Sequence, residues 1–446
     1  MLKIFIFFYY NKIKKGIELK KFIRWIYFLL LILIVNSCEN VTREQTLIKD
    51  CSIENQNRYV YNYMQDNYLW YKKMPKVNYK NYLSPEALLK DLRVDIDRWS
   101  FIINKEIFDN IFSGGTYIGY GFKKVWFDNK LYVAMVFPNS PASKAGLKRG
   151  MRILEINGVA VDNKNSQEIN NLLGERKKGV SAIFKVKDEN GIKDIKIIKD
   201  DVKFSSVIAS KILEINGKSY GYLMFNSFIE PSYNELDEVF KNFKANSVDG
   251  VIIDLRYNGG GLIGVANYLG SLLIGNKFNK EPFFKLLFND KKSAYKNSIY
   301  YLKNERNSLN IDEIYFITTN NSCSASEALI NGVKAYVDVK VFGEKSCGKP
   351  VGMVGDAFCD KYLMPIEFKI VNKNSEGDYF NGLNVDCYVT ENFRDDFGNL
   401  NEKMLNEVVY YIENRSCKND LNLKVVNKVN NQTTVKAGLK AIFNMD

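Results

Sequence analysis

The residues best suited to covalent chemistry are one serine and one lysine, 25 positions apart, in a chain of 446 residues that contains no histidine. Ser324 lies in the run Asn321-Ser-Cys-Ser-Ala-Ser-Glu327, and Lys349 ends the run Gly343-Glu-Lys-Ser-Cys-Gly-Lys349. Without histidine, neither a Ser-His-Asp hydrolase, a Cys-His hydrolase nor a His-ligated zinc site can form. A lysine amine can replace histidine as the base, so the pair predicts nucleophilic catalysis by serine.

Both residues follow apolar runs in a region, 204–417, where strand and helix patterns alternate. The expected strands and helices are, in chain order, 220–225, 233–243, 250–255, 262–274, 314–319, 325–336 and 337–342. Such alternation predicts an α/β layer with right-handed crossovers. Ligands of these folds sit at the carboxyl ends of the strands. Ser324 is expected there, exposed at a helix start, with Lys349 folding back beside it.

A glycine-rich junction, Asp254-Leu-Arg-Tyr-Asn-Gly-Gly-Gly261, follows another expected strand of the same region. Its glycines let backbone amides approach a substrate, and a helix start adds partial positive charge. We predict an oxyanion hole made from the amide of Gly260 or Gly261 and that of Ala325.

Each of these three features also has a simpler interpretation when it is considered alone. Ser324 would be a helix N-cap, and Lys349 a solvated loop lysine. The run Gly259-Gly-Gly-Leu-Ile-Gly264 matches a dinucleotide-binding fingerprint. A charged segment separates these glycines from their strand, however, and such a fingerprint normally opens its domain. The joint occurrence of serine, lysine and glycine junction favours catalysis, without a cofactor or metal.

Residues 113–203 resemble a PDZ domain. The run Gly119-Tyr-Gly-Phe122 has the form of the PDZ loop whose amides face a peptide's terminal carboxylate. It is followed by an expected strand at 131–137 and by Asn139-Ser-Pro-Ala-Ser-Lys-Ala-Gly-Leu-Lys-Arg-Gly150. A helix over 166–177 would flank the peptide groove. Residues 39–112 are expected to form a helical domain, with Ser84 capping a helix that starts at Pro85.

The first 38 residues read as an export signal. Basic residues precede the uncharged run 25–35, which is too short to span a bilayer. Ser37-Cys38 then resembles a bacterial lipobox, so Cys38 would be lipidated. The prediction is a protein of the cell envelope, lipid-anchored to a bacterial membrane on its periplasmic or outer side. The alternative is an uncleaved N-terminal anchor.

Charge argues against nucleic acid as a partner. Residues 1–37 contain seven Lys or Arg and one Glu, and the predicted tail, 418–446, contains five Lys and two Asp. Only about three of the twelve net positive charges therefore remain on the body of the chain. No two cysteines form a C-x-x-C pair, so neither a zinc nor a redox motif is indicated. Disulfides would suit an exported protein, but their connectivity stays open.

Taken together, the motifs resemble those of C-terminal processing peptidases of the S41 serine peptidase family. They include Asp97-Arg-Trp-Ser-Phe101, Gly221-Tyr-Leu-Met-Phe-Asn-Ser-Phe228, Asp254-Leu-Arg-Tyr-Asn-Gly-Gly-Gly261, Ser324-Ala-Ser-Glu327 and the run ending at Lys349. The resemblance implies a multi-domain α/β protein: a small helical N-terminal domain, a PDZ domain and a ClpP/crotonase-like peptidase domain. It also implies Ser324 as nucleophile, Lys349 as base and Glu327 as an assisting acid.

By the same resemblance, the substrates are polypeptides recognised at a free C-terminus by the PDZ loop. One position departs from the family, because Met353 stands where many members carry a glutamine that supports the lysine. The alternative function is a non-catalytic surface protein of the same fold that binds peptides.

Overall fold

The computed structural model describes residues 50–112 and 116–418. The predicted signal, the lipidation residue Cys38 and nearly all of the predicted tail lie outside these ranges. The chain divides into a unit ending at Asn55 and a unit beginning at Gln56, and all but the first residues of the elements below belong to the second unit. No helix in the part of the chain that the structure describes is long and apolar enough to cross a membrane.

The N-terminal region is mainly helical, as predicted. Its elements are α3 (Ile53–Asn67), the short 3-10 helices η1 (Tyr71–Lys73) and η2 (Tyr79–Asn81), α4 (Pro85–Leu92), β1 (Phe101–Asn104) and α5 (Lys105–Phe112). The Ser84 side chain accepts a hydrogen bond from the Ala87 amide and caps α4 as expected. Strand β1 pairs with a strand from far along the chain, so this region shares a small sheet with residues beyond 350.

The predicted PDZ region forms a β-rich domain with its own core. Its elements are β2 (Thr116–Gly119), β3 (Phe122–Phe127), β4 (Lys130–Val136), α6 (Pro141–Lys144), β5 (Arg152–Ile156), β6 (Val159–Ala160), α7 (Ser166–Leu173), β7 (Ser181–Asp188), β8 (Gly191–Ile198) and β9 (Asp200–Lys203). The main sheet has the order β3-β4-β5-β7-β8, which leaves β3 at an edge. Helix α7 ends four residues earlier than predicted, because Gly174 turns the chain with a φ of 72°.

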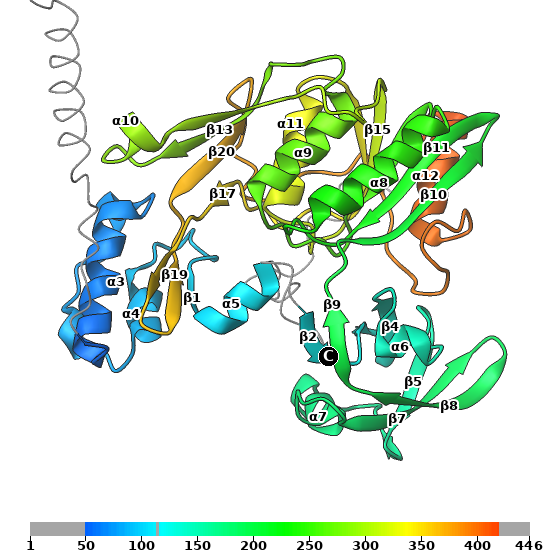
Figure 1. Ribbon diagram of the computed structural model, residues 1–446, viewed down its shortest axis with the longest axis horizontal. Helices are drawn as coiled ribbons and strands as arrows, with labels where there is room; N and C mark the ends of the chain where they lie inside the picture. Colours follow the sequence, from blue (N-terminus) through cyan, green and yellow to red (C-terminus); the bar gives the residue numbers. More distant parts are fainter. Residues whose placement is uncertain (1–49, 113–115, 419–446) are drawn as a thin grey trace, which may run out of the picture. The chain divides into compact units, whose positions relative to one another are not determined.

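The third region carries a sheet of order β10-β11-β12-β15-β16-β21, in which β11, β12, β15, β16 and β21 run parallel (Figure 1). Its elements begin with β10 (Val207–Ile215), β11 (Lys218–Phe225), α8 (Ser232–Ala245), β12 (Gly250–Asp254), α9 (Ile263–Ile274), β13 (Pro282–Phe288), α10 (Ser293–Lys296), β14 (Ser298–Tyr301), β15 (Glu313–Thr318) and α11 (Ala325–Lys334). They continue with β16 (Asp338–Gly343), β17 (Val351–Gly352), β18 (Asp356–Phe358), β19 (Lys361–Met364), β20 (Phe368–Asn372), β21 (Cys387–Tyr388) and α12 (Lys403–Asn414). The predicted α/β class and the alternation of strands and helices are confirmed.

The two faces of this sheet bury alternate residues of each strand. Val251 and Ile253 of β12 pack with α8, α9 and α11, whereas Ile252 packs on the opposite face with α12. This period-two division explains why β12 reads as an unbroken apolar run in the sequence. Smaller sheets, β14-β13-β20-β17 and β1-β19-β18, complete the region.

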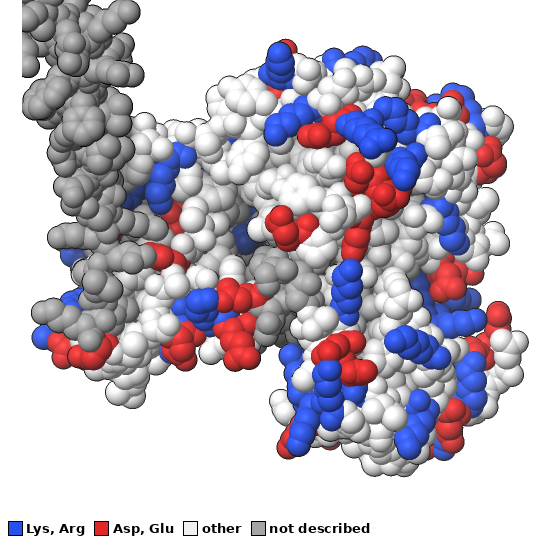
Figure 2. All heavy atoms as spheres, viewed as in Figure 1, with Lys and Arg blue, Asp and Glu red and all other residues white. Residues whose placement is uncertain are grey.

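Five charged side chains form a buried ion cluster between the PDZ region and the end of β12. Arg256 is fully buried and lies 2.7 Å from Asp254, 2.8 Å from Glu402 and 2.9 Å from Glu391. Arg149, from the PDZ region, pairs with the same Glu391. Outside this cluster, acidic and basic side chains are interspersed over the face seen in Figure 2.

Candidate active site

Ser324 occupies the turn between β15 and α11, at the carboxyl edge of the parallel sheet. It is the N-cap of α11 and has a φ of 57° and a ψ of −111°, a conformation that non-glycine residues rarely adopt. Such local strain recurs at catalytic positions, where the surrounding structure holds the side chain in place. The expectation that Ser324 is exposed is wrong, because only 8% of its surface is accessible.

The glycine junction after β12 lies directly against Ser324. A Cβ atom on Gly260, whose φ is 101°, would stand 2.8 Å from the Ser324 Cβ and 3.0 Å from the Ala325 amide nitrogen. Only glycine therefore permits this approach. The structure thus brings together the two backbone segments that the predicted oxyanion hole needs.

The hydrogen bonds distinguish between the two predicted glycine amides. The Gly260 N–H is already donated to Asn258 Oδ1 at 2.9 Å. The N–H groups of Gly261 and Ala325 make no hydrogen bond with any other described residue. The amides of Gly261 and Ala325 therefore remain available to donate hydrogen bonds to an oxyanion. The prediction that the Gly260 amide could do so is weakened.

Lys349 lies in the loop between β16 and β17. Burial lowers the pKa of its amine to about 8, although the charges of Asp97 and Glu327 act in the opposite direction. Within the described residues, the Lys349 Nζ takes part in no hydrogen bond and no ion pair. The catalytic hydrogen bond between them is thus not formed here; such bonds often tighten only when a substrate binds.

Two valines that follow Lys349 in the chain differ in exposure. Val351 is fully buried, whereas Val354 is 54% exposed. Met353 occupies the position of the family's glutamine, so no side-chain amide is available there.

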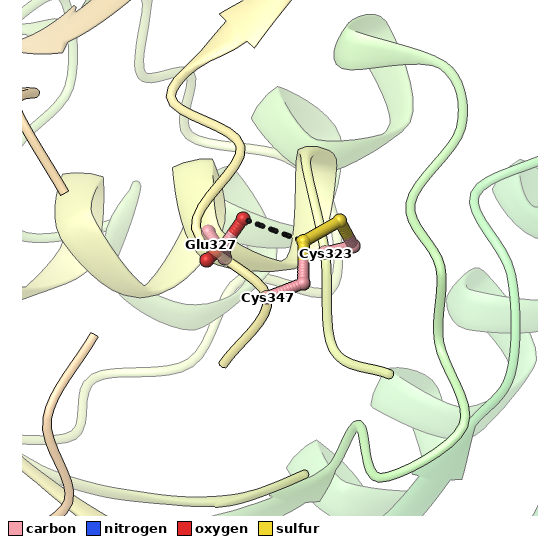
Figure 3. Close-up of side chains that lie close together, drawn as sticks. All are labelled: Cys323, Glu327 and Cys347. Atoms are coloured by element: carbon pink, nitrogen blue, oxygen red, sulfur yellow. Dashed lines mark hydrogen bonds between the residues drawn. A yellow bond between two sulfur atoms is a disulfide. The ribbon is translucent and has the colours of Figure 1, made fainter. Parts of the chain in front are cut away.

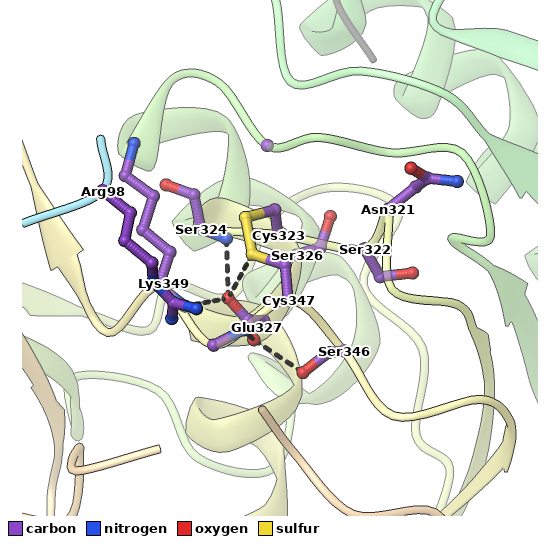
Figure 4. Close-up of a disulfide and its surroundings, with 12 residues drawn as sticks. Arg98, Asn321, Ser322, Cys323, Ser324, Ser326, Glu327, Ser346, Cys347 and Lys349 are labelled. Carbon is purple, nitrogen blue, oxygen red and sulfur yellow. Dashed lines mark hydrogen bonds between the residues drawn. A yellow bond between two sulfur atoms is a disulfide. The ribbon is translucent and has the colours of Figure 1, made fainter. Parts of the chain in front are cut away.

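Glu327 holds the candidate nucleophile, Ser324, and the candidate base, Lys349, together through their backbones. Its Oε2 accepts hydrogen bonds from the amide nitrogens of Ser324, at 2.9 Å, and Lys349, at 2.8 Å (Figure 4). Its Oε1 accepts from the Ser346 hydroxyl at 2.6 Å and the Gly348 amide at 2.7 Å. Glu327 is completely buried, and this burial raises the pKa of its carboxyl group, while the four hydrogen bonds oppose the rise. Glu327 therefore links the segment that carries Ser324 to the segment that carries Lys349.

A disulfide links the same two segments. Cys323 and Cys347 are bonded, with Cα atoms 5.2 Å apart, and the Cys347 Sγ lies 3.6 Å from Glu327 Oε2 (Figure 3). Cys323 immediately precedes Ser324, and Cys347 precedes Lys349 by two residues. A second disulfide joins Cys387 and Cys417, so the connectivity that the sequence left open is resolved for these two pairs.

The N-terminal region contributes residues that sequence reasoning did not assign to the site. Asp97 is buried and accepts hydrogen bonds from Tyr68, Trp99 and Ser100, yet its charge reaches Lys349. The neighbouring Arg98 donates to the Phe380 carbonyl at 3.0 Å. The signal for both residues was present in the Asp97-Arg-Trp-Ser-Phe101 motif, which gave no role for either side chain.

The Phe380 carbonyl belongs to a loop that packs on the segment carrying Lys349. The Phe380 carbonyl oxygen would stand 2.3 Å from a Cβ atom on Gly348, which explains the glycine there. In the same loop, the Tyr379 hydroxyl is buried and has no hydrogen-bond partner among the described residues.

The predicted carboxylate-binding loop, Gly119 to Phe122, lies in the PDZ domain, between β2 and β3. The rings of Tyr120 and Phe122 are fully buried in the PDZ core, and the Tyr120 hydroxyl donates to the Leu173 carbonyl at 2.9 Å. These two side chains therefore anchor the loop to the PDZ core and do not form the walls of a pocket. Gly121 takes a φ of 87°, which suits glycine at the turn into the edge strand β3.

Comparison with known proteins agrees with this architecture. Residues 219–386 match the model of peptidase family S41, residues 55–101 match the S41 N-terminal domain, and residues 112–181 match the PDZ domain. The chain is 26% identical over 226 residues to the carboxy-terminal processing protease CtpB of Bacillus subtilis, covering 50% of this chain and 44% of that protein. It is 25% identical over 309 residues to a probable CtpA-like serine protease of Staphylococcus aureus, covering 68% and 58%.

Among solved structures, the chain resembles a protein from Bacteroides fragilis described as an S41 protease. The TM-score is 0.70 with 26% identity, over 80% of this chain and 97% of that one. The matches to the curated relatives span about half the length of those proteins. The family resemblance inferred from the motifs is thereby confirmed: the chain belongs to peptidase family S41.

Proposed function

We propose that this protein is a serine endopeptidase whose nucleophile is Ser324 and whose general base is Lys349. One observation carries the proposal: a single carboxylate oxygen of Glu327 binds the amides of both residues. The partial burial of the lysine, which lowers its pKa, supports it, because only a neutral amine can accept the serine proton. An ordinary lysine, with a pKa near 10.4, would be neutral in about one molecule in 2,500 at pH 7. With a pKa of about 8, roughly one Lys349 amine in ten is neutral at that pH.

The steps follow from the positions of these groups. Neutral Lys349 accepts the proton of the Ser324 hydroxyl as the oxygen attacks a peptide carbonyl. The amides of Gly261 and Ala325 stabilise the resulting oxyanion. Protonated Lys349 then donates its proton to the leaving amine, and a water molecule hydrolyses the acyl-enzyme with Lys349 again as base. Glu327 holds the segments of Ser324 and Lys349 in place during all of these steps.

A fluorophosphonate probe tests this proposal without knowledge of the natural substrate. The wild-type protein should be labelled covalently at Ser324, and Ser324→Ala should not be labelled. Ser322→Ala is a matched control, because Ser322 precedes the same helix but donates its hydroxyl proton to the Leu255 carbonyl. Equal labelling of wild type and Ser324→Ala would refute the assignment of the nucleophile. Folded but unlabelled wild-type protein would favour a peptide-binding protein of the same fold.

The PDZ domain suggests how substrates are chosen. A peptide can extend the main PDZ sheet along the edge strand β3, with its terminal carboxylate at the loop formed by Gly119, Tyr120, Gly121 and Phe122. We therefore infer that the substrates are polypeptides recognised at a free C-terminal carboxylate.

A matched pair of peptides, one with a free C-terminus and one amidated, tests this inference. Because the loop is separate from the scissile bond, amidation should raise KM more than it lowers kcat. Identical kinetics for the two peptides would mean that the PDZ domain does not recognise the C-terminus of the substrate.

Export and lipidation are proposed from the sequence alone. The short apolar run that ends at Ser37-Cys38 supports attachment of lipid to Cys38, which would anchor the enzyme to a bacterial membrane in the cell envelope. Metabolic labelling with a fatty-acid analogue should label the wild type and not Cys38→Ala. Equal labelling of both would instead favour an uncleaved N-terminal anchor.

A further inference from the structure

The Cys323–Cys347 disulfide connects the two segments that carry the proposed Ser-Lys pair. It closes a loop of 24 residues whose two ends are the turn carrying Ser324 and the loop carrying Lys349. Cys323 is fully buried, whereas Cys347 is partly exposed. The backbone is hydrogen-bonded on both sides, because the Cys323 amide donates to the Asn258 carbonyl at 3.1 Å and the Cys347 amide donates to the Ser322 carbonyl at 3.0 Å. The partial exposure of Cys347 makes the lysine side the one with room to move.

The sulfur of Cys347 faces the oxygen that holds both residues. Glu327 Oε2 accepts from the amides of Ser324 and Lys349, and the Cys347 Sγ lies 3.6 Å from the same atom. In the disulfide this sulfur carries no proton, so it does not compete for the oxygen. A free thiol would add a third donor there, and a thiolate would repel the carboxylate.

Breaking the bond also requires space at a packed position. Bonded sulfur atoms stand about 2.05 Å apart, whereas unbonded heavy atoms settle at about 3.5–4.0 Å. Since Cys323 is fully buried and Cys347 is partly exposed, most of this separation must be taken up by Cys347 and its neighbours. A shift of that size, two residues before the base, would move Lys349 relative to Ser324.

We propose that the Cys323–Cys347 disulfide positions the base, so that a dithiol reductant lowers turnover and reoxidation restores it. This inference rests on the proposed peptidase function. In the step itself, two electrons and two protons pass from the dithiol to the disulfide. The products are two cysteine thiols and the cyclic disulfide of the reductant. An added disulfide such as oxidised glutathione reverses the reaction.

The direct test compares kinetics of the full chain before and after treatment with dithiothreitol. We expect kcat to fall about tenfold to a hundredfold, the scale on which a misplacement of about 1 Å slows an enzyme, while KM changes little. The acid limb of the pH profile of kcat/KM should also move to higher pH, because a loosened loop lets water reach Lys349. A disulfide with only a general structural role would not shift that limb.

The second disulfide supplies a matched control within the same chain. Cys387→Ala/Cys417→Ala should keep the activity of the oxidised wild type and should lose it on reduction to the same extent. Cys323→Ala/Cys347→Ala should have the low kcat of the reduced wild type and should not respond to dithiothreitol. If this second variant does not fold, the reductant titration of the wild type still decides the question.

Thiol labelling followed by mass spectrometry must accompany the kinetics. Unchanged kcat after proven reduction of Cys323–Cys347 would overturn the inference and leave the proposed peptidase function standing. A bond that resists excess dithiothreitol in the folded protein would overturn it as well. Failure of the peptidase function itself looks different, because the oxidised wild type would then neither cleave peptides nor react with the fluorophosphonate.

Discussion

Two regions of this protein place a cation in different surroundings, one among acidic partners and the other without them. In the ion cluster, Arg256 lies within hydrogen-bonding distance of Asp254, Glu391 and Glu402. Burial alone would raise the pKa of Glu402, yet the facing Arg256 and Arg149 lower that pKa to about 2. At the candidate active site, Lys349 has no such partner among the described residues, and burial lowers its pKa to about 8.

The difference lies in how the nearby carboxylates are used. Asp97 and Glu327 are both close enough to Lys349 to influence its pKa. Their oxygens, however, are occupied by backbone amides and hydroxyl groups, including those of Ser100 and Ser346. A buried cation with paired acids remains charged and contributes to structure, whereas one denied such pairing can lose its proton and act as a base.

The largest expected effect is the loss of activity when Lys349 becomes a permanent cation. Lys349→Arg should lower kcat/KM by about 10²- to 10⁴-fold, because arginine does not lose its proton in proteins and general-base catalysis is worth about that much. Peptide hydrolysis measures the loss, and circular dichroism should show an unchanged fold. Retained activity would reveal a different base.

Arg256→Met tests the other half of the comparison. It would leave three buried carboxylates facing one remaining arginine, and we expect unfolding to become easier by about 3–5 kcal/mol. Urea denaturation measures this change. Lys241→Met is the control, because Lys241 pairs with Glu238 on the exposed surface and should alter stability by no more than about 0.5 kcal/mol. Similar effects of the two substitutions would contradict the structural role of the cluster.

Lys349→Met should have the opposite effect on stability. Because the folded-state pKa of about 8 lies below the usual lysine value, protons bind more tightly to the unfolded chain. The resulting penalty is complete below pH 8 and disappears as pH rises toward the unfolded pKa. The substitution should therefore stabilise the protein by roughly 1–3 kcal/mol at pH 7 and by less at pH 9. A loss of stability at pH 7 would mean that Lys349 is paired in solution.

The sequence predicted the elements of the catalytic region because their signals are local. Buried parallel strands appear as apolar runs, glycine marks the closest backbone approach at Gly260, and serine with proline marks the start of α4. The candidate residues Ser324 and Lys349 could also be named, since strand ends in an α/β sheet converge on one edge, whereas Glu327 was named from the family resemblance.

What the sequence could not predict depends on contacts between distant segments. Arg149 and Glu391 meet across 242 positions, and neither has a local pattern that points to the other. The same holds for Asp97 and Lys349, and for the choice of cysteine partners. The exposure expected for Ser324 was wrong for a similar reason, because its burial depends on the glycine junction after β12, which packs against it from elsewhere in the chain.

The smallest expected effect is the pH dependence of the wild-type enzyme, and it tests the unpaired state of Lys349 most directly. The base works only when neutral, so kcat/KM should rise with pH and level off above about pH 8, the pKa that burial gives the amine. At pH 7 the value should be about tenfold below the plateau, since each pH unit below the pKa removes a factor of ten. The rate of fluorophosphonate labelling should follow the same curve, which excludes titration of the peptide as its cause. A midpoint near pH 10 would place Lys349 in water, and one near pH 6 would assign the base to another group.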